Sequence, residues 1–406
     1  MNNTIKLAVA AALLAGASSA NAGIMIPAGD WTLDIGGIVN AYYTSTRQSG
    51  DFDGLNGSVL GGSNTADVKT SSNITTGLLP NYLSVSGKTR QNDLDVGFTI
   101  SINPGASTTR SGIQSANQEN RQAFLTFGDK TWGSVKLGKD LGIYASDAIL
   151  NDMTLLGVGS GAGLLAGNTT TLGRIGTGFM YADWKSQIAY SSPNWNGFSF
   201  TAGVTQAWDA TAAKVQLGAK PSAFDSFESV GRGGSSPAFE GKASYEWAGD
   251  FGGKVWVSGI TQKVNGANDR AEAFDIGATV NVAGFGLTGY YGKGQGTGTT
   301  VQLRDGFDSL GNSRDSDDYY VQGTYTIPGV GTKLGVSYGK STLEGNGATD
   351  TGLGNVEYSN RMWTIGAYHP LTKHLNLVAE YDDVKTEIGS AQGKSKTVAL
   401  GAILFF

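Results

Sequence analysis

The feature that most constrains this chain is a recurring alternation of apolar and polar residues with a period of two. From 239 to 247 the odd positions are apolar or small, whereas the even positions are Glu, Lys, Ser and Glu. The segments 198–204 and 375–382 separate in the same way. A period of two predicts β-strands with one apolar and one polar face. A soluble β-sandwich would show the same alternation, so the connections between strands must decide between the two architectures.

These connections alternate between long and short. Long ones such as 140–183 are separated by tight turns such as 90–93, although the connection 265–270 is short where a long one is expected. An even number of strands, with long loops at one rim and short turns at the other, is typical of an all-β transmembrane antiparallel β-barrel. We expect sixteen strands, at 31–45, 81–89, 94–102, 120–128, 132–139, 184–191, 198–208, 238–248, 254–264, 271–280, 285–292, 318–326, 332–340, 360–369, 375–382 and 397–406.

The prolines agree with this assignment. Proline has no backbone N–H to donate to a neighbouring strand, so it should avoid the middle of paired strands. All eight prolines fall within or at the border of the expected connections, at Pro27, Pro80, Pro104, Pro193, Pro221, Pro237, Pro328 and Pro370. Because no linker or break in composition interrupts the chain, we expect one barrel domain over residues 23–406.

The N-terminal residues predict an export signal. Lys6 precedes an apolar stretch from 7 to 17, and Ala20, Asn21 and Ala22 form a small-x-small cleavage site. We therefore expect a signal peptide over residues 1–22 that is cleaved after Ala22. The apolar stretch is too short to span a bilayer and no other segment holds about 18 consecutive apolar residues, so transmembrane helices are excluded. Only a barrel would place this chain in a membrane.

The segment 397–406 is a strand-forming, largely apolar run. An unpaired edge of this hydrophobicity would invite aggregation, so we expect the segment to close the barrel against the strand at 31–45. In that register Val398, Leu400, Ala402, Leu404 and Phe406 face outward. Ile403 and Phe405 would then face the mouth of the lumen, where polar side chains are expected.

Composition excludes several classes of function. The formal net charge is −5 at pH 7, which argues against nucleic acid as a partner. His369 and His374 flank one tight turn, but no cluster of carboxylates or thiolates accompanies them, so we expect no metal and no cofactor. A nucleophilic hydrolase needs a base beside a serine, and both histidines lie at the short-turn rim. We therefore expect a protein that is not an enzyme.

The connection 140–183 carries more large apolar residues than a loop exposed to water needs. They are Met153, Leu155, Leu156, Val158, Leu164 and Leu165. We expect this connection to fold inward, pack against the barrel wall and narrow a wide aqueous lumen. A mobile surface loop is the alternative.

Three short motifs resemble those of a known family. The stretch 119–124, Glu-Asn-Arg-Gln-Ala-Phe, is similar to a fourth-strand motif, and 172–176, Leu-Gly-Arg-Ile-Gly, resembles a second basic position. The triplet 151–153, Asn-Asp-Met, falls where the third loop carries an acid. The chain resembles, over essentially its whole mature length, the trimeric sixteen-stranded general porins of Gram-negative outer membranes. The resemblance implies a third external loop folded into the lumen, with acids facing a ladder of basic residues on the wall.

From this resemblance we expect Arg121 and Arg174 to belong to the basic ladder and Asp152 to be the constriction acid. The resemblance also implies an outer-membrane homotrimer surrounded by lipid. It makes the strand that ends at Phe406 the signal read by the barrel-assembly machinery.

Elementary physics assigns related roles. An arginine that faces lipid costs about 2–4 kcal/mol at mid-membrane, so Arg121 should point into the lumen. Alternation with neighbouring apolar residues makes Lys136 and Lys88 further lumen bases. Acids and bases on opposite sides of a narrow pore produce a transverse field that orients solutes and biases ion passage.

Departures from the family pattern leave ion preference open. Gly36 and Tyr82 stand where further wall bases are common, and Leu156 stands where a second loop acid is common. Several bases against one acid favour anions, whereas the acidic total charge favours cations near the mouth.

The function we expect is passive diffusion of small hydrophilic solutes and ions through an outer-membrane channel. A substrate-specific porin and a structural or adhesive barrel with a closed lumen are the alternatives.

Overall fold

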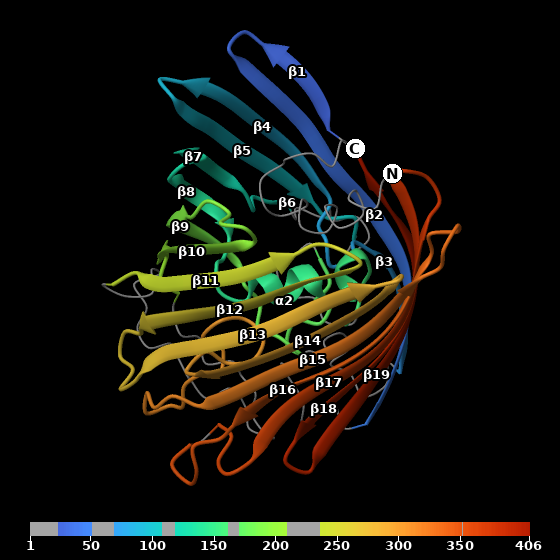
Figure 1. The fold of residues 1–406 in the computed structure, drawn as a ribbon. Coiled ribbons are helices and arrows are strands. Elements are labelled where there is room, and N and C mark those ends of the chain that lie inside the picture. The colour runs from blue at the N-terminus through green and yellow to red at the C-terminus, as the bar shows by residue number, and fades with distance from the viewer. Residues whose placement is uncertain (1–22, 51–68, 108–117, 161–169, 209–235, 351) are drawn as a thin grey trace.

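The computed structural model describes residues 23–50, 69–107, 118–160, 170–208, 236–350 and 352–406 (Figure 1). The expected signal peptide and cleavage site lie outside these residues or at their border. Sixteen strands form a closed antiparallel barrel. They are β2 (Trp31–Gly50), β4 (Tyr82–Gln91), β5 (Leu94–Pro104), β7 (Ala123–Asp129), β8 (Gly133–Leu141), β9 (Trp184–Ser191), β10 (Phe198–Thr205), β11 (Ala238–Trp247), β12 (Phe251–Lys263), β13 (Arg270–Val282), β14 (Phe285–Gln295), β15 (Asp315–Thr326), β16 (Lys333–Glu344), β17 (Glu357–Pro370), β18 (Leu375–Ile388) and β19 (Ala391–Phe405).

Three short strands add to this ring. β1 (Ile24–Ala28) pairs with the start of β2, β3 (Thr70–Thr75) with its later part, and β6 (Gln118–Glu119) with the end of β5. The segment between β8 and β9 holds the helix α2 (Ser146–Asn151) and the 3₁₀ turn η2 (Met153–Leu156). Figure 1 shows α2, in green, among the strands of the barrel. In the described part of the chain, no helix is long and apolar enough to cross a membrane.

Each of the sixteen expected strands corresponds to one of the observed ring strands. Most differences lie at the long-loop rim, where β2, β17 and β18 continue beyond the expected ends. The last strand begins at Ala391 rather than 397. The sequence missed this start because the residues after Ala391 are Gln, Gly, Lys and Ser, which show no apolar alternation. A tight turn at 389–390 therefore joins β18 to β19, and Gly389 has a φ of 55° there, a backbone conformation that favours glycine.

The expected strand 120–128 is also corrected. β7 begins at Ala123, so Arg121 lies between β6 and β7 rather than within a strand.

The barrel closes where the sequence predicts. β19 is antiparallel to β2, with Phe405 opposite Ile38. The Gly37 N–H donates to the Phe406 carbonyl at 2.8 Å, and the Phe406 N–H donates to the Gly37 carbonyl at 3.0 Å. The terminal strand therefore has partners along both edges.

Alternation along the strands separates two faces. Outward-facing apolar residues such as Ile365 and Leu400 are 60% and 53% exposed, as expected for a surface that faces lipid. Val398 and Leu404 face outward as predicted. Ile403 faces inward and is buried in the same apolar cluster as Ile38 and Tyr42, which accounts for its apolar character.

Candidate functional site

The segment that follows β8 is held by inward-facing side chains of the barrel wall. The N–H groups of Ile143 and Tyr144 both donate to Glu240 Oε2 on β11, each at 2.8 Å. Lys185 Nζ on β9 lies 2.5 Å from Glu240 Oε1, and neither of these side chains is exposed. Glu240 thus joins two wall strands to the start of the segment.

Helix α2 is held by two further lysines. Asp147 lies 3.1 Å from Lys242 Nζ on β11 and 2.7 Å from Lys254 Nζ on β12. Burial alone would raise the pKa of the Asp147 carboxyl, but the two lysines outweigh it, and the pKa is lowered. The carboxylate stays charged at neutral pH and ties α2 to the wall.

Strand β15 holds the end of α2 and the start of η2. Tyr320 Oη donates to the Ala148 carbonyl at 2.9 Å. Gln322 uses both ends of its amide, since it accepts from the Met153 N–H at 2.8 Å and donates to the Asn151 carbonyl at 2.6 Å. The bonds to Ala148 and Asn151 satisfy carbonyl groups that the short helix leaves free at its C-terminus.

The tip of the segment lies against β18. Glu380 Oε2 accepts from the N–H groups of Val158 and Gly159 at 2.7 and 3.0 Å, and Tyr368 Oη donates to Oε1 at 2.6 Å. A Cβ at Gly157 would lie 2.0 Å from Glu380 Oε1, closer than any real contact. Position 157 therefore requires glycine while the carboxylate holds the tip.

Apolar contacts reinforce these bonds. Met153, Leu155 and Val158 are buried in one cluster with wall residues such as Trp256 and Met362. Phe179, on the limb that returns to β9, lies edge-on to Tyr320 with ring centroids 5.8 Å apart. The described large apolar residues of this segment thus pack against the inward face of the wall, whereas Leu164 and Leu165 lie outside the described residues.

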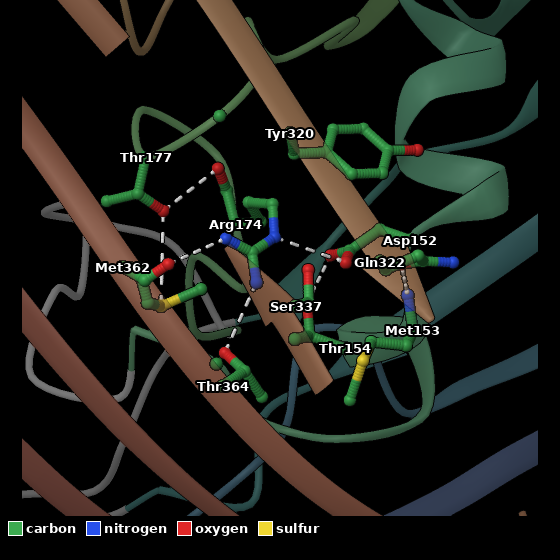
Figure 2. A network of polar contacts seen from close by, with 12 residues as sticks. Asp152, Met153, Thr154, Arg174, Thr177, Tyr320, Gln322, Ser337, Met362 and Thr364 are labelled. Atoms are coloured by element: carbon green, nitrogen blue, oxygen red, sulfur yellow. Dashed lines mark hydrogen bonds and ion pairs between the residues drawn. The ribbon is translucent and has the colours of Figure 1, made fainter. Parts of the chain in front are cut away.

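Figure 2 shows the pair formed by Arg174 and Asp152. Arg174 Nε lies 3.5 Å from Asp152 Oδ1, too far for a hydrogen bond but within an ion pair, and neither side chain is exposed. The guanidinium also donates to the Met362 carbonyl at 3.2 Å and to Thr364 Oγ1 at 3.3 Å, both on β17. The pair therefore ties the two limbs of the segment to each other and to the wall.

This geometry corrects one expectation. We expected Asp152 and Arg174 on opposite sides of the pore, where they would contribute to a transverse field. Their charges instead face each other directly, because both residues lie within the segment between β8 and β9 and both are covered.

Arg121 is buried, with 5% of its surface exposed. Its Nε donates to Glu119 Oε2 at 2.6 Å, and Nη2 donates to Thr170 Oγ1 at 3.3 Å. The guanidinium carbon lies 5.7 Å from the ring centroid of Trp184, a cation–π distance. Arg121 therefore contacts the returning limb of the segment.

Lys136 and Lys88 lie on the inward face but apart from the other candidates. Lys136 is opposite Ala189 on β9, its Nζ pairs with Asp140 Oδ2, and 29% of its side chain is exposed. Lys88 is exposed and three residues from the end of β4, at the short-turn rim. The structure thus brings Arg174 and Asp152 together and leaves Lys88 remote.

Sequence reasoning missed Glu240, Glu380 and Lys185. The alternation of 239–247 and 375–382 places both glutamates on the polar faces of their strands. The sequence carries no signal for which polar residue meets the segment between β8 and β9, because that depends on where the strands stand around the ring.

The histidines make ordinary contacts. His369 Nδ1 lies 2.9 Å from Thr332 Oγ1, and the Phe405 N–H donates to the His374 carbonyl at 2.9 Å. Among the residues that the structure describes, no three His, Cys, Asp or Glu side chains are grouped to hold a metal ion.

Solved structures of outer-membrane proteins share this fold. The outer membrane channel DcaP of Acinetobacter baumannii is 16% identical, with a TM-score of 0.64 over 94% of this chain and 99% of that one. OmpF of Salmonella typhi, solved with daunomycin, is 15% identical, with a TM-score of 0.54 over 93% and 100% of the two chains. In-vitro folded OmpT of Vibrio cholerae, solved in a trimer form, is 13% identical, with a TM-score of 0.52 over 91% and 99%.

Curated protein sequences gave no significant match. A family model described as Gram-negative porin matches residues 8–389. Together with the closed sixteen-stranded barrel, this match identifies the chain as a member of the Gram-negative porin family.

Proposed function

We propose that this porin lets small hydrophilic solutes and ions diffuse passively across the outer membrane, and that the segment between β8 and β9 limits the size of its pore. A channel in the outer membrane is the function of the family to which the chain belongs. The size limit and the selectivity of the pore are the finer part of the proposal.

The observation that carries the size limit is the set of contacts made by this segment with inward-facing wall residues. Glu240 on β11, Gln322 on β15 and Glu380 on β18 each bind its backbone. Because these strands are spread around the ring, the segment is fixed across part of the interior. A fixed segment of this kind leaves less room for solutes than a wide empty lumen.

We assign different roles to the candidate charges. Arg174 and Asp152 position the segment, since both are covered. Lys136 is the base best placed to act on passing ions, because part of its side chain is exposed. Arg121 acts beside the returning limb, and Lys88 acts at the short-turn mouth.

Planar-bilayer recording of the purified protein tests these roles. Stepwise, persistent conductance is expected, and its absence would refute the channel. In a salt gradient, Lys136→Gln should move the reversal potential toward cation preference, because it removes a positive charge from the ion path. Lys263→Gln, on the outward face of β12, is the matched control and should leave the potential unchanged.

The wider alternatives have their own outcomes in the same recording. An unchanged reversal potential in both Lys136→Gln and Arg121→Gln would show that these bases do not set selectivity. Saturable block of the current by one sugar or carboxylate would indicate a substrate-specific porin instead of a general one.

We further propose that residues 1–22 are removed on export, that the strand ending at Phe406 is read by the barrel-assembly machinery, and that the mature chain forms a homotrimer. The trimer form in which OmpT was solved supports the last point. Mass measurement of the purified protein in mild detergent tests the oligomeric state, and N-terminal sequencing tests cleavage after Ala22.

A further inference from the structure

The outward face of the barrel carries a row of basic residues near the long-loop rim. Strand pairing places Lys340 opposite Arg361, Arg361 opposite Lys385, and Lys385 opposite Lys394. Two residues further along β19, Lys396 is opposite Arg47 on β2. We call these six residues the basic row: Lys340, Arg361, Lys385, Lys394, Lys396 and Arg47.

All six side chains point away from the interior. Their immediate neighbours Ser341, Asn360 and Thr386 are fully buried and face inward, so the alternation turns the bases outward. The row therefore crosses five neighbouring strands, from β16 through β19 to β2, on the surface that faces the membrane.

Described carboxylates lie within ion-pair distance of only three of the six bases in this row. Like charges directly opposite each other on paired strands are destabilising. Three carboxylates relieve part of this repulsion: Glu357 lies 2.9 Å from Lys340, Glu387 lies 2.6 Å from Lys385, and Asp383 lies 3.7 Å from Lys396. Within the described residues, Arg361, Lys394 and Arg47 have no carboxylate at ion-pair distance. Three positive charges are left for another partner.

The height of the row indicates what that partner is. Two residues from Lys340 and Arg361, toward the short-turn rim, lie Tyr338 and Trp363, whose ring centroids are 4.6 Å apart. Aromatic girdles of this kind mark the boundary between the apolar band of a barrel and the headgroups. Two residues along a strand span about 7 Å, so the row lies at headgroup level.

The leaflet follows from the connections at this rim. The connection 345–356 joins β16 to β17 beyond the row, whereas a short turn at 327–332 joins β15 to β16 at the opposite rim. Longer loops of such barrels are extracellular. The row therefore faces the headgroups of the outer leaflet.

From this arrangement we propose that the basic row binds the phosphate groups of an outer-leaflet lipid whose acyl chains cover the apolar surface below. Arg and Lys are the side chains that bind phosphate best. A membrane lipid fits better than a free phosphate ion, because the row continues directly into exposed apolar residues such as Ile365 and Val336, 60% and 47% exposed. The inference rests on the outer-membrane location and not on the pore.

Bases elsewhere on the same rim provide a matched control. Lys263, Arg270 and Lys293 also face outward, on β12, β13 and β14. There, Arg270 lies 3.4 Å from Glu272, Lys293 is opposite Asp317 on β15, and Lys263 is opposite Arg270. Two carboxylates thus lie beside a group of only three bases on three strands, so removing these three charges should affect phosphate binding far less than removing three from the six-base row.

The test compares a triple variant of the row, Arg361→Gln, Lys394→Gln and Arg47→Gln, with the control Lys263→Gln, Arg270→Gln and Lys293→Gln. Native mass spectrometry of the full protein in detergent would measure binding of bisphosphorylated lipid A, of the same lipid after removal of its phosphates, and of pyrophosphate. The row variant should bind bisphosphorylated lipid A about 100-fold more weakly, from about 1 kcal/mol for each base. The control should differ little from the unmodified protein.

Three results would overturn the proposal. They are equal binding of bisphosphorylated lipid A by the row variant and the control, equally tight binding of the lipid without phosphates, and pyrophosphate binding as tight as that of the lipid. Dissociation of an oligomer in the row variant, with unchanged lipid binding, would assign the row to a contact with a second copy of the chain. Unchanged single-channel conductance in both variants shows that the barrel has folded.

Discussion

Two regions of the inner wall have the same sequence pattern but different roles. On β11, β15 and β18, the polar inward residues Glu240, Gln322 and Glu380 are buried and bind the segment between β8 and β9. On β4 and β8, inward residues such as Ser86 and Lys136 remain partly exposed. We call the first region the anchoring wall and the second the exposed wall. A polar face on a barrel strand therefore does not by itself mean a face that contacts water.

The difference lies in how the charges are compensated. In the anchoring wall, Glu240 and Glu380 each accept from two backbone N–H groups, and Glu240 also pairs with the buried Lys185. Leaving one member of such a group unpaired is costly, because the remaining charge or donor stays out of water. In the exposed wall, water replaces a lost partner. Substitutions should thus separate the two regions by their effect on stability.

Glu240→Ala should give the largest effect. It leaves the buried Lys185 without a carboxylate, with only Gln302 Oε1 to accept from its Nζ, and frees the N–H groups of Ile143 and Tyr144. Removing one partner of a buried ion pair costs about 3–5 kcal/mol, so the free energy of unfolding in urea should fall by this amount.

Ser86→Ala is the matched control in the exposed wall. It removes one hydroxyl contact, to Thr99 Oγ1 at 2.9 Å, and should cost about 0.5–1.5 kcal/mol. An equal loss in the free energy of unfolding of Glu240→Ala and Ser86→Ala would contradict the distinction between the two walls.

A smaller effect is expected from Asp147, and it should depend on pH. Asp147→Asn weakens contacts with Lys242 and Lys254 and should cost about 1.5–3 kcal/mol at neutral pH. The pKa of Asp147 is lowered in the folded protein from 3.8, so its charge stabilises the fold above that value. This contribution is lost as the pH falls below 3.8 and through the lowered pKa.

Urea unfolding of the unmodified protein and of Asp147→Asn, measured from pH 7 down to pH 2, tests whether the stabilisation by Asp147 is lost at low pH. The difference between the two free energies should be constant near neutral pH and should shrink at the acidic end. A difference that grows as the pH falls would contradict the assignment of Asp147 as a charged anchor.

The sequence predicts the barrel far better than it predicts the anchoring wall. The alternation within each segment predicts that strand by itself, so all sixteen strands can be found without knowing which strands pair. The pairing of the last strand with the first also follows, because a closed barrel leaves the last strand no other partner. The ends of strands at the long-loop rim are harder to predict, since the first residues of β19 are mostly polar and show no apolar alternation.

The candidate site is less predictable because its contacts join distant parts of the chain. Glu380 binds the N–H of Val158, 222 residues away in sequence. Nothing near either residue indicates the other. The motifs around Asp152 and Arg174 identify both residues as candidates. They do not indicate whether the two charges face the pore or pair with each other.

Gly157→Ala sharpens the comparison with the smallest change. A Cβ there would lie 2.0 Å from Glu380 Oε1, so the tip must move away from β18. Overpacking of this kind costs about 1–3 kcal/mol, enough to loosen the tip while the barrel stays folded. The expected result is a noisier single-channel current, with a smaller loss in the free energy of unfolding than in Glu240→Ala.

Gly289→Ala is the control, since no atom lies within 4 Å of its new Cβ, and its single-channel current should match that of the unmodified protein. A quiet, unchanged current in Gly157→Ala would mean that the tip does not reach the ion path, and the anchoring wall would then serve stability alone.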